Sequence, residues 1–203
     1  YKPRIDMDLL KEHSPGLIGL SGCLGGEVAQ LLGPDSKSEE GSPDKDRDID
    51  RAIERAKAYQ AIFGKENYFI EIMKHGIEGQ DKVLPDLLTI SSEIDAPLVA
   101  TNDCHYVTQD QAEAHDALLC VQTNALIDDE SRFRFDGEEY YVKTTDEMYD
   151  LFGDLKIACE NTLLIAKKCT YFPVESKPKL PKLSNEKISE NQLLIKYSYD
   201  CLL

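Results

Sequence analysis

Hydrophobic and polar positions in the first half of the chain form two kinds of segment that alternate. Nearly continuous apolar runs predict strands that are buried on both faces, at residues 16–23, 67–73 and 96–103. Between these runs, apolar residues recur three and four positions apart, which is typical of amphipathic helices. The helices expected on this basis cover residues 25–33, 48–64 and 80–94, and a shorter one ends at His13. Strands and helices that alternate at this spacing indicate parallel βα units and an α/β fold.

Helical periodicity dominates the second half of the chain. Residues 110–123 predict a helix in which Ala114, Leu118 and Val121 form one apolar stripe. Further helices are expected over residues 158–169 and from residue 190 onward. The chain is therefore expected to continue from βα units into helical segments.

Two short signals between these helices predict local structure. Asp136-Gly137 separates two short extended pieces, which is typical of a β-hairpin. Thr144 and Glu147 have the spacing of a capping box, and they predict the start of a helix that runs through Phe152.

Two polar stretches are expected to lie outside regular structure. Residues 34–46 combine proline, glycine and serine with charged residues, which indicates a surface loop. Residues 171–187 contain three prolines and several lysines without periodicity, which indicates a linker. Pro85 falls inside the helix expected at residues 80–94, and it is tolerable there only if the helix starts nearby or kinks.

The composition supports a folded domain with an acidic surface. The chain has 203 residues, of which 41% are hydrophobic, so it can form one good-sized domain, or one domain with an appendage, around a real core. No apolar stretch approaches the length of a membrane span. The net charge is −15, and such a surface repels the phosphate backbone of DNA. A nucleic acid partner would therefore need local basic patches, metal ions or regions outside this chain. Solubility alone is the simpler explanation of the acidity.

The start of the chain and its cysteines indicate the compartment. The first residues contain no apolar h-region, so they are not a signal peptide, and they lack an initiator methionine. We therefore expect the chain to be a fragment of a longer protein. The six cysteines form no CxxC pair, and four of them lie in apolar helical patterns: Cys120, Cys159, Cys169 and Cys201. Reduced thiols in the cytoplasm fit this usage better than a disulfide framework.

The ends of the expected strands carry side chains that suit a metal ion. Cys23 follows the first strand, Glu71 lies in the second, and Asp103 and His105 follow the third. Functional groups gather at the carboxyl ends of parallel strands, and residues two apart on extended chain point to the same side. A carboxylate and an imidazole suit zinc or manganese, and a thiolate would favour zinc or iron.

Each of these features also has a structural explanation. Asn102-Asp103 is a pair that favours a turn, and a buried thiol beside glycines usually packs as a small hydrophobic group. Glu71 could be a strand carboxylate with a basic neighbour. The other histidines are expected to have structural or surface positions, with His75 closing a strand-to-helix turn and His13 and His115 on the surface. The residues alone leave both readings open.

Several stretches in the same order resemble one protein family. They are YKPRIDMDLL, GLIGLSGCLGGEV, NYFIEIMKHGI, PLVATNDCHYV, AHDALLCVQTNALIDDESRFRF, YYVKTTDEMYDLF and ACENTLLIAKKC. Together they resemble the PHP domain (polymerase and histidinol phosphatase) of bacterial DNA polymerase III alpha subunits. The resemblance implies a distorted (β/α)7 barrel. It assigns residues 1–175 to the C-terminal part of that domain, and residues 176–203 to a linker and the first helix that leads into the polymerase palm.

The resemblance also implies a metal site and a function. Cys23, Asp103 and His105 match the family's ligand positions for divalent ions, here zinc or manganese. The family's earlier ligands lie upstream of Tyr1, and the palm carboxylates that hold the magnesium ions for nucleotide addition lie downstream of Leu203. No polymerase catalytic residue is therefore expected in this chain, and the chain alone is expected to be inactive.

The function implied is that of the intact polypeptide. It is template-directed DNA synthesis on primer-template DNA with deoxynucleoside triphosphates, with a 3′–5′ proofreading exonuclease at the PHP site. The implied partners are a sliding clamp and a separate exonuclease subunit, and no membrane. Two alternatives stay open: a metal-free PHP scaffold that docks an exonuclease, and a stand-alone PHP phosphoesterase. The second fits less well, because the segments after residue 110 resemble the polymerase.

Overall fold

The computed structural model describes residues 4–33, 47–178 and 188–201. The chain divides into two compact units, Tyr1–Cys169 and Thr170–Leu203. The surface loop predicted at residues 34–46 and half of the predicted linker lie outside the described residues. The boundary expected at residue 175 stays a prediction. Among the described residues, no helix is both long and apolar enough to cross a membrane.

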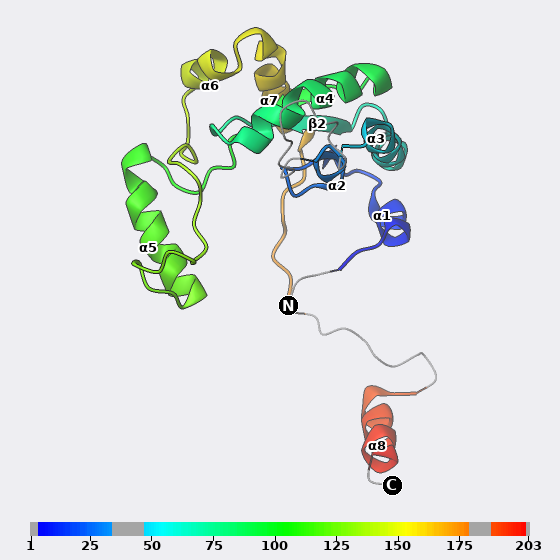
Figure 1. The fold of residues 1–203 in the computed structure, drawn as a ribbon. Coiled ribbons are helices and arrows are strands. Elements are labelled where there is room, and N and C mark those ends of the chain that lie inside the picture. The colour runs from blue at the N-terminus through cyan, green and yellow to red at the C-terminus, as the bar shows by residue number, and fades with distance from the viewer. Residues whose placement is uncertain (1–3, 34–46, 179–187, 202–203) are drawn as a thin grey trace. The chain divides into compact units, whose positions relative to one another are not determined.

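A parallel sheet forms the centre of the first unit (Figure 1). Its strands are β1 (Gly19–Leu20), β2 (Tyr68–Ile72) and β3 (Leu98–Ala100), in the order β1-β2-β3. Both neighbours of β2 run parallel to it, which confirms the prediction of parallel βα units. The closed (β/α)7 barrel stays a prediction, because the described part of the chain holds an open three-stranded sheet.

The central strand β2 is covered on both faces. Tyr68, Phe69 and Ile70 are consecutive residues with no exposed surface. Consecutive strand residues point to opposite faces, so each face of β2 must pack against other elements. This burial explains why the strand reads as a continuous apolar run in the sequence.

The described residues of the βα part form four helices. They are α1 (Met7–His13), α2 (Glu27–Gln30), α3 (Ile49–Phe63) and α4 (Glu78–Ile94). The start of α3 is capped by the Asp48 side chain, which accepts a hydrogen bond from the Arg51 amide, and Gly64 ends it with a φ of 89°. Helix α4 continues through Pro85, although the proline removes one helical hydrogen bond.

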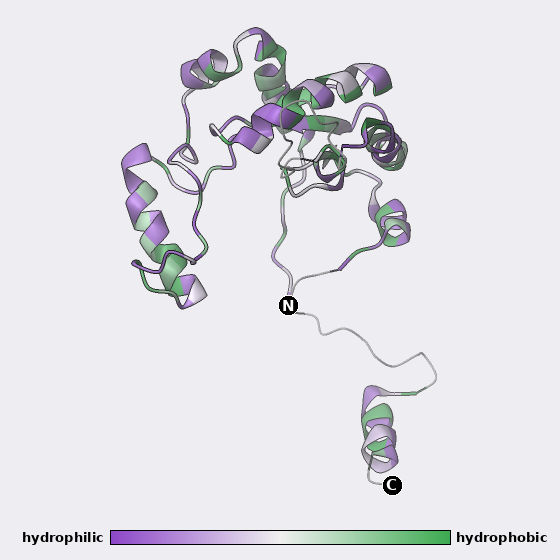
Figure 2. Cartoon of the chain, in the orientation of Figure 1, coloured by the Kyte–Doolittle hydropathy of each residue, from purple (hydrophilic) through white to green (hydrophobic). Residues whose placement is uncertain are grey.

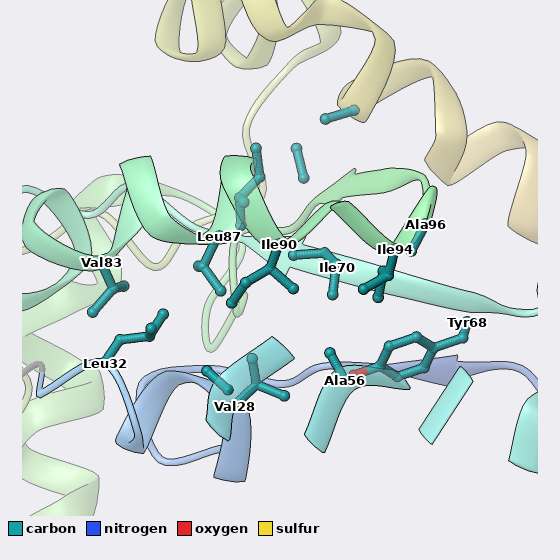
Figure 3. Packing of buried hydrophobic residues seen from close by; sticks show 14 of the residues in the cluster. Val28, Leu32, Ala56, Tyr68, Ile70, Val83, Leu87, Ile90, Ile94 and Ala96 are labelled. Atoms are coloured by element: carbon teal, nitrogen blue, oxygen red, sulfur yellow. The ribbon is translucent and has the colours of Figure 1, made fainter. Parts of the chain in front are cut away.

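The hydrophobic core lies between α2, α3, α4 and one face of β2 (Figure 3). In this view the side chains of α4 point toward those of α2, with Ile70 of β2 beside them. The labelled members are Val28, Leu32, Ala56, Tyr68, Ile70, Val83, Leu87, Ile90, Ile94 and Ala96. Most of them come from segments that the sequence predicts as amphipathic helices, whereas Tyr68, Ile70 and Ala96 come from the runs predicted as strands.

An ion pair joins Arg47, two residues before α3, to α4. The Arg47 guanidinium donates to both carboxylate oxygens of Asp86, at 2.7 and 2.6 Å, and Asp86 is only 8% exposed. Arg47→Met is expected to destabilise α4 by about 1–2 kcal/mol, because it leaves a buried carboxylate without this partner. Hydrogen exchange of the α4 amides measures the loss. Arg51→Met is the control, since its pair with Asp48 is long and exposed, and equal losses would contradict the prediction.

The later helices are η1 (Gln109–Gln111), α5 (Ala112–Thr123), α6 (Thr145–Phe152), η2 (Gly153–Leu155), α7 (Lys156–Lys168) and α8 (Glu190–Asp200). The capping box is confirmed: the Thr144 hydroxyl accepts from the Glu147 amide, and the Glu147 carboxylate accepts from the Thr144 amide. Helix α6 also ends at Phe152 as predicted.

The predicted hairpin is wrong. Gly137 does form a turn, with a φ of 79°, but residues 133–143 contain no paired strands of their own. Tyr141 instead forms an isolated parallel bridge with Tyr106. The segment therefore pairs with the chain after β3 and not with itself.

Helix α5 exposes the stripe that its sequence makes apolar. Leu118 is 62% exposed and Val121 is 79% exposed, whereas Leu119 and Cys120 on another side are buried. Hydrophobic residues are visible along α5 in Figure 2. The prediction that Cys169 and Cys201 behave as small hydrophobic residues is also wrong, because both are exposed. All six cysteines are free thiols.

Candidate metal-binding site

The topology gathers the predicted site residues at one edge of the sheet. Because β1, β2 and β3 are parallel, their carboxyl ends lie at the same edge. Cys23 follows β1, Glu71 lies near the end of β2, and Asp103 and His105 follow β3. The outer strands β1 and β3 are separated by β2, hence by two strand spacings or roughly 10 Å. Glu71 therefore comes from the strand between Cys23 and the Asp103–His105 pair.

Cys23 lies in a tight turn after β1. The Gly26 amide donates to the Cys23 carbonyl at 2.8 Å, and Gly22 takes a φ of 85°. The thiol is exposed, so it is not the packing residue that its glycine neighbours suggested. Cys23, Glu71 and Gln80 line the same cavity, together with apolar residues of α4 such as Val83.

Glu71 connects the three strands at this edge. Its amide donates to the Ser21 hydroxyl at 2.9 Å, and its carboxylate accepts from the Thr101 hydroxyl at 2.7 Å. The predicted basic neighbour is thus replaced by a hydroxyl from the end of β3. A hydroxyl donates a hydrogen bond without adding positive charge, and a carboxylate held in this way suits a cation.

Asp103 and His105 lie close together in a turn. Asp103 has a φ of 42°, so the extended chain assumed in the sequence argument is wrong here. The two side chains are still neighbours, with 3.9 Å between Asp103 Oδ1 and His105 Nδ1. A left-handed backbone at a residue other than glycine costs free energy, and such positions are frequent at functional sites.

The His105 ring is oriented in a way that suits coordination. Its Nδ1 lies 2.6 Å from the carbonyl oxygen of Asp103. A carbonyl can only accept, so Nδ1 carries a proton, and in the neutral ring Nε2 presents its lone pair. Histidine ligands usually donate their other nitrogen to a carbonyl or a carboxylate in this manner. The side chains of Asp103 and His105 are 46% and 31% exposed, so an ion can reach both.

Aromatic rings surround His105. The ring centroid of Phe135 lies 4.5 Å from that of His105, that of His115 at 5.3 Å and that of Tyr140 at 5.8 Å. The sequence predicted a surface position for His115 and did not reveal this contact between α5 and the turn after β3. His13 is exposed as predicted.

Burial and nearby carboxylates keep Tyr140 protonated. Burial is the larger cause that raises the pKa of its hydroxyl, and Asp136 and Asp103 add to the effect. Tyr140 is therefore neutral beside Asp103 and cannot serve as a base at ordinary pH.

An ion pair holds the segment that carries Phe135. The Arg132 guanidinium donates to both oxygens of Asp116 on α5, at 2.6 and 2.5 Å. These hydrogen bonds hold the pKa of the Asp116 carboxyl below its usual range. The pair holds the loop after α5 against that helix. The same loop carries Phe135, whose ring contacts His105.

The described residues do not form a complete metal site. No group of three or more histidine, cysteine, aspartate or glutamate side chains that could hold an ion occurs in the part of the chain that the structure describes. Asp103 and His105 form a pair, and Cys23 lies with Glu71 in a separate cavity. The ligand assignment of Cys23, Asp103 and His105 therefore stays a prediction, and the orientation of His105 is the observation that fits it.

Comparison with known proteins supports the resemblance drawn from the motifs. Residues 1–75 match the family model of the PHP domain. The chain is 44% identical over 168 residues to the DNA polymerase III subunit alpha of Saccharopolyspora erythraea, which covers 82% of this chain and 13% of that protein. It is 39% identical over 181 residues to the protein of the same name from Treponema pallidum, covering 89% of this chain and 14% of that protein.

A third relative gives the same result. The chain is 47% identical over 148 residues to the DNA polymerase III subunit alpha of Deinococcus radiodurans, covering 73% of this chain and 10% of that protein. The chain thus spans about a seventh or less of the length of these relatives. The aligned lengths also exceed the 75 residues that the PHP model matches, so the similarity continues beyond the domain match.

Proposed function

We infer that this chain, which corresponds to a PHP-domain segment of DNA polymerase III alpha subunits, serves DNA replication as part of such a polymerase polypeptide. The observation that supports this most is the 44% identity over 168 residues, a length that no single motif could account for. The activity belongs to the intact polypeptide: DNA synthesis from deoxynucleoside triphosphates on a primer-template. Magnesium ions at a site outside this chain would support nucleotide addition.

A metal site at the strand ends is the second part of the proposal. His105 offers Nε2, Asp103 offers a carboxylate with no bound Arg or Lys partner among the described residues, and Cys23 offers an exposed thiol. Ligands from outside this chain would complete the site. A bound zinc or manganese ion would neutralise phosphate charge and lower the pKa of a water, which is the chemistry that 3′–5′ exonuclease proofreading needs.

The chain's own residues would contribute position and charge. The Asp103 carbonyl fixes the tautomer of His105, because it accepts the Nδ1 proton. The carboxylates of Asp103 and Glu71 make the edge of the sheet attractive to cations in an already acidic protein. Without cations, the same charge would repel the DNA backbone, so processing of DNA at this edge depends on them.

Metal analysis of the full-length polypeptide tests this site. The unmodified protein should hold at least one zinc or manganese ion per chain. Asp103→Ala and His105→Ala should each weaken metal affinity more than about tenfold, since removing a ligand costs at least as much as removing its hydrogen-bond partner. Cys104→Ser is the control, because Cys104 lies between these residues but contacts the Tyr141 carbonyl.

A metal-free scaffold is the alternative function. The observation in its favour is that the described residues assemble no group of three ligands. In that case the full-length polypeptide would carry no stoichiometric metal, its primer extension would be intact, and proofreading would come from a separate exonuclease subunit. Normal metal content in Asp103→Ala and His105→Ala would also contradict the ligand assignment, while leaving the polymerase assignment untouched.

A further inference from the structure

Four buried residues form a cluster beside the turn that carries Asp103 and His105, and hydrogen bonds and a ring stack join them. His75, Gln80, Asn102 and Tyr140 are between 4% and 7% exposed. They come from the turn after β2, the start of α4, the end of β3 and the segment before α6. Burial of polar groups is costly unless they are hydrogen-bonded, so the hydrogen bonds of this cluster indicate which segments it holds in place.

The bonds fix the tautomer of His75. The His75 amide donates to Gln80 Oε1 at 2.7 Å, which leaves the amide nitrogen of the same side chain to face the ring. That nitrogen lies 2.8 Å from His75 Nδ1 and can only donate, so Nδ1 accepts. The ring proton is therefore on Nε2, which donates to the Asn102 carbonyl at 3.0 Å.

Both ring nitrogens of His75 are thus engaged within the protein. This excludes His75 as a metal ligand and as a proton acceptor in the arrangement observed. It agrees with the prediction that His75 closes the turn between β2 and α4. The Asn102 carbonyl that it holds belongs to the residue directly before Asp103, whose backbone is left-handed.

The Asn102 side chain connects the turn after β3 to residues 139–141. Its Nδ2 donates to the carbonyls of Glu139 and Tyr141, at 2.9 and 2.7 Å. The His105 amide donates to the intervening Tyr140 carbonyl at 2.7 Å, and the Tyr140 ring stacks on His75 at 4.3 Å. Asn102 Oδ1 is buried without a hydrogen-bond partner among the described residues, so the two Nδ2 bonds determine the orientation of this amide.

We propose that His75 is a positioning residue for Asp103 and His105. Its Nε2–H holds the Asn102 carbonyl and thereby the left-handed turn that places the Asp103 carboxylate and the His105 ring side by side. The Tyr140 ring packs on His75. The segment 139–141 is held by the Asn102 side chain, and its Tyr140 carbonyl in turn binds the His105 amide. The role in metal binding rests on the proposed metal site, but the positioning of the turn does not.

Two substitutions separate the hydrogen bond from the stack. His75→Phe keeps an aromatic ring against Tyr140 and loses the Nε2 donor. His75→Gln loses the ring and keeps a donor at nearly the reach of Nε2. In the full-length polypeptide, His75→Phe is expected to accelerate exchange of the His105 amide at least tenfold and to weaken zinc or manganese affinity about tenfold, as the loss of a supporting hydrogen bond does. His75→Gln should retain most of both properties.

The Ile70 amide serves as the internal control for folding. It donates to the Pro97 carbonyl at 3.0 Å within the sheet, and its exchange should be unchanged in both variants. The inference is overturned if His75→Phe leaves the His105 amide as protected as before, or if His75→Gln loses that protection equally. If the unmodified protein binds neither metal, the proposed metal site fails, while the amide exchange still decides whether His75 positions the turn.

Discussion

Replacing Ile90 with alanine is expected to lower the stability of the βα part of the chain by about 2–5 kcal/mol. Ile90 has no exposed surface and lies in the core between Leu87, Ile94 and the residues of α2 and β2 (Figure 3). The substitution removes three carbon atoms from a position enclosed by rigid elements, so the cavity cannot collapse fully. Hydrogen exchange of the β2 amides measures the change, because these amides open only when the core does.

Leu118→Ala is the matched control for this substitution. Leu118 is also an aliphatic residue on a helix, but 62% of its surface is exposed. Its replacement should change the stability by less than about 0.5 kcal/mol. Similar losses for the two variants would mean that the exposed stripe of α5 is packed in the protein and that the core does not lie where the structure places it.

The strands and helices around β2 could be predicted from the sequence because their signals are local. A continuous apolar run such as that of β2 arises only when both faces are covered. The Thr144 and Glu147 capping box is also local, since its two bonds close within three residues. Such patterns determine which element forms and leave open which elements meet.

The hairpin prediction was wrong because residues far away in the sequence determine the hydrogen bonds of that segment. The carbonyls of Glu139, Tyr140 and Tyr141 are all used by Asn102 and His105, more than thirty residues earlier in the chain. Asp136-Gly137 supplies the turn, but these carbonyls are no longer available to pair the two sides of a hairpin. Local turn chemistry is thus overridden by hydrogen bonds that the sequence pattern does not reveal.

The places of the candidate ligands at the strand ends could be predicted from the sequence, but their mutual geometry only in part. Strand ends correctly indicated where Cys23, Asp103 and His105 would lie along the sheet. The order β1-β2-β3 is not visible in the local pattern, and it puts a strand between Cys23 and the other two residues. The left-handed backbone of Asp103 and the contact of His115 with His105 are equally nonlocal, because both depend on the segments packed behind them.

Gly26→Ala is expected to disrupt the turn that carries Cys23 at a cost of about 3 kcal/mol, the upper part of the range for overpacking. A Cβ at Gly26 would lie 2.5 Å from the Ser21 carbonyl oxygen and 3.1 Å from the Cys23 carbonyl oxygen. Both contacts are with backbone, which cannot move aside as a flexible side chain can. The chain must therefore open the turn, and the hydrogen bond from the Gly26 amide to the Cys23 carbonyl is the first to be lost.

Gly25→Ala separates this close approach from a general intolerance of the turn. A Cβ at Gly25 would meet only the Cys23 sulfur, at an ordinary 3.8 Å, so this variant should be nearly neutral. Hydrogen exchange of the residue 26 amide and the alkylation rate of Cys23, followed by peptide mass spectrometry, measure both variants. Gly26→Ala should raise both rates while Gly25→Ala leaves them unchanged. Equal behaviour of the two variants would show that the Ser21–Gly26 contact does not hold the turn, and that the position of the Cys23 thiol depends on something other than this backbone packing.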